Sequence, residues 1–150
     1  MKSSRLLSLI AMLPLFASAC PVSMPNLATP AGALPASKSH GWYGTDQLAA
    51  LIPRDGHWSG MGPARNYGDK FWWWAAGYSP SDDPVPNLVV SATQLDHQDS
   101  YSHSSKATHG YGDDWGAMLV GMEFPRAGCW QVTGSYRGRE LRMVLEVGKK

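Results

Sequence analysis

The sequence lacks a strong excess of charge of either sign and any long apolar run beyond its first twenty residues. It contains 13 basic and 12 acidic residues, and removal of the first 19 residues, which include Lys2 and Arg5, leaves 11 basic against 12 acidic ones. A chain with this balance has no basic surface of the kind that neutralises nucleic-acid phosphates. No stretch after Cys20 approaches the ~18 consecutive apolar residues of a membrane-spanning helix. We therefore expect neither a nucleic-acid partner nor a transmembrane segment.

Motifs of known chemistry are missing as well. The sequence contains no G-x-S-x-G nucleophile turn, and its 16 glycines form neither a Walker A loop nor a dinucleotide-binding fingerprint. Neither H-E-x-x-H nor paired C-x-x-C occurs. We therefore name no catalytic residue, expect no cofactor and favour a non-enzymatic role, although a glycosidase-type pair of carboxylates needs no fixed motif.

The first 19 residues have the layout of a secretory signal peptide. Lys2 and Arg5 precede an apolar stretch over residues 6–17, which is too short to span a hydrocarbon core of ~30 Å. That stretch ends in Ala-Ser-Ala before Cys20 and resembles the lipobox of bacterial lipoproteins. The resemblance implies that Cys20 is lipidated and that acyl chains bind the protein to a membrane. Cleavage at the same bond without lipid is the alternative, because Ala-x-Ala is also an ordinary signal-peptidase motif.

The signals around Cys20 also predict a location and a domain layout. Pro21 follows Cys20, and no acidic residue there favours retention in an inner membrane. We expect a lipid-anchored protein of the cell envelope, on the periplasmic side of the outer membrane where the cell has one. Residues 20–40 are rich in proline, alanine and serine, which is typical of an extended tether. Residues 41–150 are then left as one domain.

The state of Cys129 depends on that of Cys20. If Cys20 carries lipid, Cys129 has no partner within the chain, and we expect it to be a buried structural thiol. If Cys20 is not lipidated, a Cys20–Cys129 disulfide becomes possible in an oxidising compartment.

Short alternating segments predict a mainly β domain. Apolar and polar residues alternate with a period of two, or nearly so, at 87–95, 116–124, 129–136 and 140–147. Residues 70–76 read as a further, very aromatic strand, and the last three of the alternating strands read as an antiparallel meander. These strands favour a small antiparallel β-sandwich, for which an immunoglobulin-like layout is one arrangement.

Two other segments interrupt this strand pattern. Thr45 is an N-cap residue for the apolar run that ends before Pro53, which predicts one short N-terminal helix over residues 45–52. Residues 96–114 are polar and rich in serine, histidine and glycine, so we expect them to form one long loop.

Two motifs resemble those of a family of short exported bacterial proteins and lipoproteins of unknown activity. The first motif consists of Met61-Gly62-Pro63, Asn66-Tyr67, Asp69-Lys70 and the three tryptophans at 72–74. The second consists of Gly128-Cys129-Trp130, Thr133-Gly134, Tyr136 and Gly138. The resemblance covers residues 41–147 and implies export, a single domain and a β-rich fold, but it carries no catalytic residue. The section from His97 to His109 is richer in histidine than the resemblance leads one to expect.

The tryptophan run supplies the candidate binding surface. In a strand, Phe71 and Trp73 face one side while Trp72 and Trp74 face the other, so a single core cannot bury both pairs. One interpretation is that the second pair is covered by neighbouring residues of the domain, including the expected helix. The other is an exposed aromatic surface that binds a sugar face, a peptide or an envelope protein. The candidate residues of this surface are Trp72, Trp74, Trp42 and Tyr43.

A binding domain that uses this aromatic surface to hold an envelope protein or a glycan is our leading functional hypothesis. The alternative is a metal-binding or enzymatic lipoprotein that acts through the loop containing His97, His103 and His109. Imidazole and carboxylate groups together can hold zinc or copper. The six-residue spacing of these histidines matches no compact metal motif, however, and a solvated polar loop is the simpler interpretation.

Overall fold

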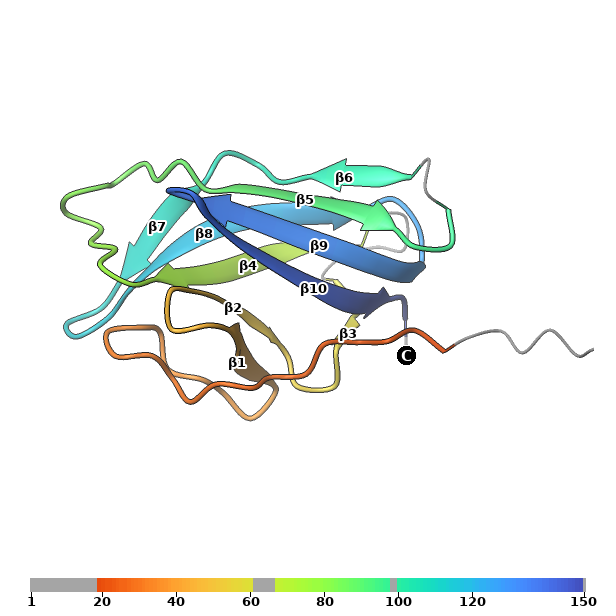
Figure 1. The fold of residues 1–150 in the computed structure, drawn as a ribbon, viewed down its shortest axis with the longest axis horizontal. Helices are drawn as coiled ribbons and strands as arrows, with labels where there is room; N and C mark the ends of the chain where they lie inside the picture. Colours follow the sequence, from red (N-terminus) through yellow and green to blue (C-terminus); the bar gives the residue numbers. More distant parts are fainter. Residues whose placement is uncertain (1–18, 61–66, 98–99, 150) are drawn as a thin grey trace, which may run out of the picture.

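The computed structural model describes residues 19–60, 67–97 and 100–149, which form ten strands joined by turns and loops (Figure 1). The strands are β1 His40–Gly44, β2 Leu48–Pro53, β3 His57–Trp58, β4 Tyr67–Ala75, β5 Val89–Gln94, β6 Tyr101–His103, β7 Thr108–Tyr111, β8 Gly116–Phe124, β9 Gly128–Tyr136 and β10 Arg139–Val147. Almost all of the expected signal peptide and residues 61–66 of the first motif lie outside the described residues.

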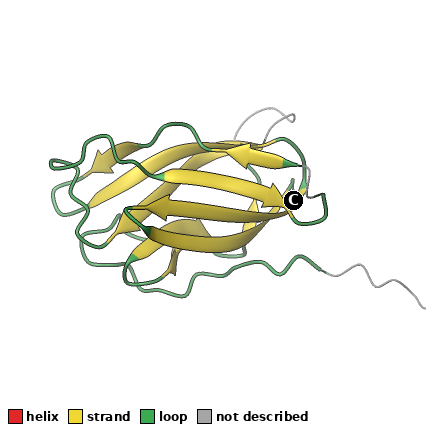
Figure 2. Cartoon of the chain, turned by 45° about the horizontal axis from the view of Figure 1, so that its top comes forward, coloured by secondary structure: helices red, strands yellow, loops and turns green. Residues whose placement is uncertain are grey.

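The ten strands form two five-stranded sheets that pack face to face (Figure 2). The first sheet has the order β1-β2-β4-β8-β7 and is antiparallel throughout. The second has the order β3-β10-β9-β5-β6, and its β3–β10 pair is parallel. The predicted β-sandwich is therefore confirmed, whereas the expectation of antiparallel pairing throughout is wrong at β3.

The main core lies between the two sheets, where the predicted alternation places the apolar side chains. On β8 and β10 every second residue is buried, as expected: Met118, Val120, Met122, Phe124, Leu141, Met143, Leu145 and Val147. Aromatic rings join the sheets across this core. Trp58 meets Phe71 edge-on at 4.8 Å, and Phe124 meets Trp130 at 5.3 Å between ring centroids. Such perpendicular pairs place the positive edge of one ring against the negative face of another.

The three C-terminal strands do not form the expected meander. Strands β9 and β10 are a hairpin, but β8 pairs with β4 and β7 in the opposite sheet. The chain therefore crosses from one sheet to the other between Phe124 and Gly128. In this arrangement the apolar faces of β8 and β9 pack on each other across the core, as the contact of Phe124 with Trp130 shows.

The expected helix at 45–52 is wrong, because residues 48–53 form strand β2. All five residues from Leu48 to Ile52 are buried, with β1 on one side of the strand and β4 on the other. A short apolar run buried on both faces has no period from which a helix and a strand can be told apart. The N-cap signal serves a turn instead, since the hydroxyl oxygen of Thr45 accepts the backbone N–H groups of Gln47 (3.2 Å) and Leu48 (3.3 Å).

The expected long loop at 96–114 also contains regular structure. Strand β6 closes one edge of the second sheet and β7 closes one edge of the first. Both strands are short and largely polar, which is usual for edge strands because polar side chains discourage pairing with other chains. Because these two strands contain few apolar residues, alternation of apolar and polar residues does not predict them.

The segment expected to be a tether packs as part of the domain. We call residues 20–39 the strap; Figure 1 shows it running alongside β1 and β2. Near its start the amide of Ser23 donates to the carbonyl of Val144 (2.8 Å), and further along the amide of Leu27 donates to that of Trp42 (3.1 Å).

The strap builds a second core on the outer face of the first sheet. The buried members of this core are Ala33, Trp42, Ala49 and Leu51, with Leu27, Leu34, Ala36, Trp72 and Trp74 partly buried around them. The indole N–H of Trp42 donates to the carbonyl of Leu34 at 2.9 Å, so the buried polar group is satisfied.

A disulfide joins the start of the strap to the start of β9. Cys20 and Cys129 are bonded, their Cα atoms are 5.5 Å apart, and neither cysteine of the described chain is free. The expectation that Cys129 is a buried thiol is therefore wrong for this form of the chain. The bond closes a loop of 109 residues in sequence separation, a length at which cross-linking strongly restricts the unfolded chain.

The packing of the strap predicts that Trp42→Ala is severely destabilising. Trp42 is fully buried, so its loss should lower the free energy of unfolding by about 3–5 kcal/mol. Urea denaturation measures this loss of stability. Tyr101→Ala is the control, because Tyr101 is 67% exposed and its loss should change stability by less than about 0.5 kcal/mol. A Trp42→Ala protein as stable as the control would contradict a packed strap.

Candidate functional site

A groove at one end of the sandwich is the candidate site. It lies where the connection between β4 and β5 meets the β7–β8 hairpin, at the left of Figure 1. Its volume is about 670 Å³, which falls within the usual range for ligand sites. We call it the aromatic groove; it is lined by Gly32, Tyr78, Ser79, Pro80, Ser81, His109, Tyr111, Gly112, Asp113, Asp114, Trp115 and Gly116.

The walls of the aromatic groove are tied together by hydrogen bonds. A ring nitrogen of His109, Nδ1, donates to the carbonyl of Pro84 at 2.7 Å and so joins β7 to the β4–β5 connection. The amide of Gly116 donates to the carbonyl of Gly32 at 2.9 Å, which joins the hairpin to the strap. The groove is therefore formed before any ligand arrives, and binding there costs little ordering.

The tip of the β7–β8 hairpin is shaped by a glycine. The amide of Gly112 donates to the carbonyl of Trp115 at 2.9 Å and closes the turn. A Cβ atom at Gly112 would collide with the indole nitrogen of Trp115, so only glycine allows this ring to fold back over the turn. The turn places Asp113 and Asp114 on the rim of the groove, where both side chains are exposed.

Two pairs of rings give the groove its aromatic character. Trp115 stands perpendicular to Trp72, with ring centroids 6.0 Å apart. Tyr111 stacks on His109, with centroids 5.9 Å apart and planes within 17° of parallel. Tyr111 is 71% exposed, so most of its ring is open to solvent.

The four residues predicted to form an exposed aromatic surface do not form one. Trp42 is fully buried in the second core, and Trp72 and Trp74 are partly buried there beside it. Tyr43 packs against the main core, on the other face of β1 from Trp42. The interpretation that the second tryptophan pair is covered describes their packing better, but the cover is the strap, since no helix is present among residues 19–60, 67–97 and 100–149. Trp72 reaches the aromatic groove only through its contact with Trp115.

The structure does not bring the three candidate histidines together. His103 lies on β6 in the second sheet and His109 on β7 in the first. His97 lies in the turn before β6, where its carbonyl accepts the amide of Ser100. No group of three or more His, Cys, Asp or Glu side chains within the described part of the chain is placed to hold a metal ion. Only His109 belongs to the aromatic groove.

Asp83, which the sequence did not single out, fixes the β4–β5 connection that supplies one wall of the groove. The hydroxyl of Tyr136 donates to Asp83 Oδ2 at 2.7 Å, and the guanidinium of Arg137 lies 3.1 Å from the same oxygen. The hydroxyl of Tyr78 donates to the backbone carbonyl of Asp83 at 3.3 Å. The two contacts of the Asp83 carboxylate fasten the β4–β5 connection to the end of β9 and to the β9–β10 turn, whereas the Tyr78 contact lies within the connection. The two contacts to β9 and its turn join residues far apart in the chain, so no local sequence pattern predicts them.

Burial dominates the titration of both tyrosines in this cluster. It raises the pKa of Tyr136 to about 12, and the hydrogen bond to Asp83 adds to the effect. Burial likewise raises the pKa of Tyr78 to about 12, with a contribution from the negative charge of Asp83. Each hydroxyl therefore remains protonated and able to donate its hydrogen bond over the physiological pH range.

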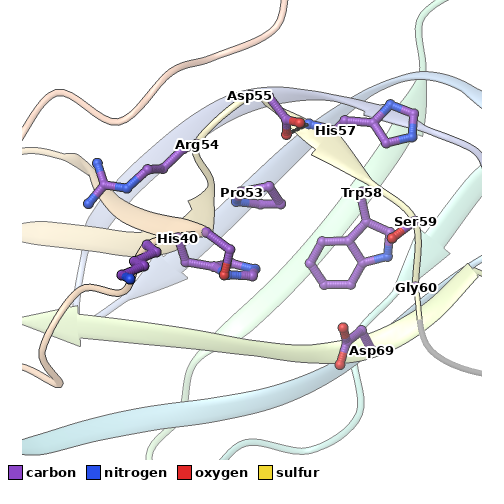
Figure 3. A pocket seen from close by; sticks show the side chains of 11 residues that line it. His40, Pro53, Arg54, Asp55, His57, Trp58, Ser59, Gly60 and Asp69 are labelled. Atoms are coloured by element: carbon purple, nitrogen blue, oxygen red, sulfur yellow. Dashed lines mark hydrogen bonds between the residues drawn. The ribbon is translucent and has the colours of Figure 1, made fainter. Parts of the chain in front are cut away.

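A second, smaller pocket of about 350 Å³ lies beside β3 and the β1–β2 hairpin (Figure 3). It contains charged groups of both signs, but the chain itself engages several of them. The Nε atom of Arg54 donates to the carbonyl of Ser37 at 3.1 Å. His57 Nε2 bonds the carbonyl of Gly148 at 3.0 Å, and its amide donates to Asp55. Residues 61–66, which follow Gly60 in the sequence, lie outside the described residues.

Comparison with known proteins does not assign the chain to a family. No family model, no curated protein and no solved structure matches the chain. Within the described residues, no helix is long and apolar enough to cross a membrane.

The raised pKa values predict a loss of stability at alkaline pH. An unfolded tyrosine releases its proton near pH 10, whereas folded Tyr78 and Tyr136 hold theirs to about pH 12. Their contribution is fully present below about pH 10 and disappears as the pH rises through about 12, because the unfolded state then binds fewer protons than the folded state. Thermal denaturation followed from neutral pH to pH 12 measures this fall.

A comparison of two phenylalanine variants isolates the cause of the alkaline fall. Tyr136→Phe should be less stable than the wild type near neutral pH and should lose less stability on going to pH 12, because the titrating group is gone. Tyr101→Phe alters an exposed ring and should follow the wild type. Parallel curves for the wild type and Tyr136→Phe would show that Tyr136 does not titrate in the way described.

Proposed function

We propose that this chain is a non-enzymatic binding domain of the cell envelope and that the aromatic groove is its binding surface. The observation that carries the proposal is the preformed groove of about 670 Å³ with Tyr111 held open to solvent in it. Exposed aromatic side chains on a rigid support are typical of binding sites, because they offer a large contact area at a small cost in conformational entropy. The aromatic surface of the leading hypothesis thereby moves from Trp72 and Trp74 to Tyr111 and Trp115.

We also propose that the sandwich has an immunoglobulin-like layout. The order β2-β4-β8-β7 in the first sheet corresponds to strands A, B, E and D of such domains. The order β5-β9-β10 in the second sheet corresponds to C, F and G, with β6 in the place of C′. Strand β1 is an addition, and the disulfide starts from the strap rather than from strand B.

This layout supports the choice of the aromatic groove. In immunoglobulin variable domains the loops at one end of the sandwich, including B–C and F–G, carry the binding residues. The β4–β5 connection corresponds to the B–C loop and lines the groove, and the β9–β10 turn corresponds to F–G and is fastened to it through Arg137 and Asp83. In many folds, loops that are held in place by a rigid scaffold carry the binding residues.

Export and lipidation of Cys20 stay predictions from the sequence. A sulfur that carries a diacylglyceryl thioether cannot also form a disulfide, so the structure with a Cys20–Cys129 bond is that of the unacylated chain. The strap packs on the domain from Ser23 onward. An acyl chain on Cys20 would therefore hold the domain close against the membrane, without the spacer that the composition suggested.

The intact mass of the mature protein from its own envelope distinguishes the two states of Cys20. Cleavage before Cys20, which the sequence predicts, together with the disulfide would give a chain that begins at Cys20, carries no acyl group and weighs two hydrogens less than its reduced form. A mass increased by acyl groups would establish the lipid anchor instead, and Cys129 would then react with a thiol reagent after denaturation. Either mass leaves the proposal for the aromatic groove standing.

Replacement of Tyr111 tests the proposed binding surface. Purified cell walls and membrane vesicles of the source cell are sedimented with the mature protein, and the bound fraction is measured over a range of concentrations. Tyr111→Ala should weaken binding about tenfold or more, as the loss of a central aromatic contact does. Tyr101→Ala removes an equally exposed ring from the other sheet and should bind as the wild type does. Equal binding by both variants would refute the proposal.

A further inference from the structure

We propose that the aromatic groove binds a saccharide that carries no negative charge. Tyr111 and Trp115 would contact the face of a sugar ring, and the carboxylates of Asp113 and Asp114 would accept hydrogen bonds from its hydroxyl groups. This inference rests on the proposed function and names the class of ligand for the same site.

The rings in the groove fit the apolar face of a sugar. The face of an aromatic ring is electrically negative, and the C–H groups on one side of a pyranose ring present slightly positive hydrogens to it. Tyr111 is backed by His109 and Trp115 by Trp72, so each ring is held in place by another. Rings that are already fixed lose little entropy when a ligand is laid against them.

The polar groups of the groove fit the hydroxyl groups of a sugar. The carboxylates of Asp113 and Asp114 can accept hydrogen bonds from hydroxyl groups, and O–H···O⁻ hydrogen bonds are among the stronger kinds. The hydroxyls of Ser79 and Ser81, 2.8 Å apart on the opposite wall, offer further donors and acceptors. A sugar ring carries several hydroxyl donors close together, which matches a site with several acceptors.

The charge of the groove excludes anionic ligands. Its lining contains two carboxylates, and neither lysine nor arginine occurs among the described residues that line it. A phosphate, sulfate or uronate group would face uncompensated negative charge at the rim, and like charges brought together disfavour binding. The ligand is therefore a neutral or amine-bearing saccharide rather than an acidic one.

A proline-rich peptide is the competing occupant, because such peptides also dock in aromatic grooves. The groove favours a saccharide over such a peptide, because its carboxylates need hydrogen-bond donors. Proline has no backbone N–H, so a proline-rich segment brings few donors to the carboxylates of Asp113 and Asp114 and would leave them unpaired against its apolar surface.

Calorimetric titration of the mature protein with three tetrasaccharides tests the inference. The ligands are the tetramers of N-acetylglucosamine, which is neutral, of glucosamine, which is cationic, and of galacturonate, which is anionic. We expect binding of the neutral or the cationic tetramer and at least tenfold weaker binding of the anionic one. Tyr111→Ala should weaken the binding at least tenfold, and Tyr101→Ala should leave it unchanged.

A second variant tests the role of the carboxylates. In the double variant Asp113→Asn and Asp114→Asn the amides keep the size of the side chains but remove their charge. This variant should bind the preferred saccharide several-fold less tightly and should discriminate less against the galacturonate tetramer. Unchanged affinity and unchanged discrimination would show that the two carboxylates do not face the ligand.

The remaining outcomes separate this inference from the proposal beneath it. If none of the tetrasaccharides binds, or if Tyr111→Ala binds them as the wild type does, the saccharide inference is wrong. If a proline-rich peptide binds instead and loses affinity in Tyr111→Ala, the groove is a peptide site. In both cases sedimentation with envelope fractions that still depends on Tyr111 would leave the binding function intact. If sedimentation with the envelope fractions did not depend on Tyr111, both the proposed binding function and the saccharide inference would be wrong.

Discussion

The fold depends on one constraint, which is that strand β4 carries large aromatic side chains on both of its faces. Phe71 and Trp73 point into the core between the sheets, and Trp72 and Trp74 point out of it. A two-layer sandwich has only one core, so the outer pair would stand in water without a further layer. The strap supplies that layer, and Trp42 completes it from β1. The domain is therefore built from two sheets and a covering segment.

The covering segment also connects the two ends of the molecule. It begins at the disulfide beside β9 and reaches the aromatic groove at Gly32, which accepts a hydrogen bond from the β7–β8 hairpin. Trp72, partly buried in the second core, supports Trp115 in the groove. The tryptophan run thus serves binding indirectly, because it positions the rings that meet the ligand. A loosened strap would disturb the groove through this contact.

The sequence allowed the fold class and the core faces of β8 and β10 to be predicted. Each of those strands buries one face in the core and turns more polar residues to the other, so apolar and polar residues alternate along it. It could not identify β2, whose apolar run is buried on both sides, or β6 and β7, whose polar composition reflects their place at sheet edges. The aromatic groove combines a turn before β5 with a hairpin tip, and only the tertiary fold brings these together. The pairing of Cys129 could not be decided while the chemistry of Cys20 was open.

Hydrogen exchange of the protein, followed by mass spectrometry on peptides covering residues 22–44, tests this account most directly. Amides bonded within a packed strap, such as those of Ser23, Leu27 and Ala33, exchange only when the structure opens. The account predicts that these peptides exchange much more slowly than an unstructured chain of the same sequence. Exchange at the unstructured rate over residues 22–36 would show a free tether, and the covered tryptophans, the second core and the support of the groove would all have to be abandoned.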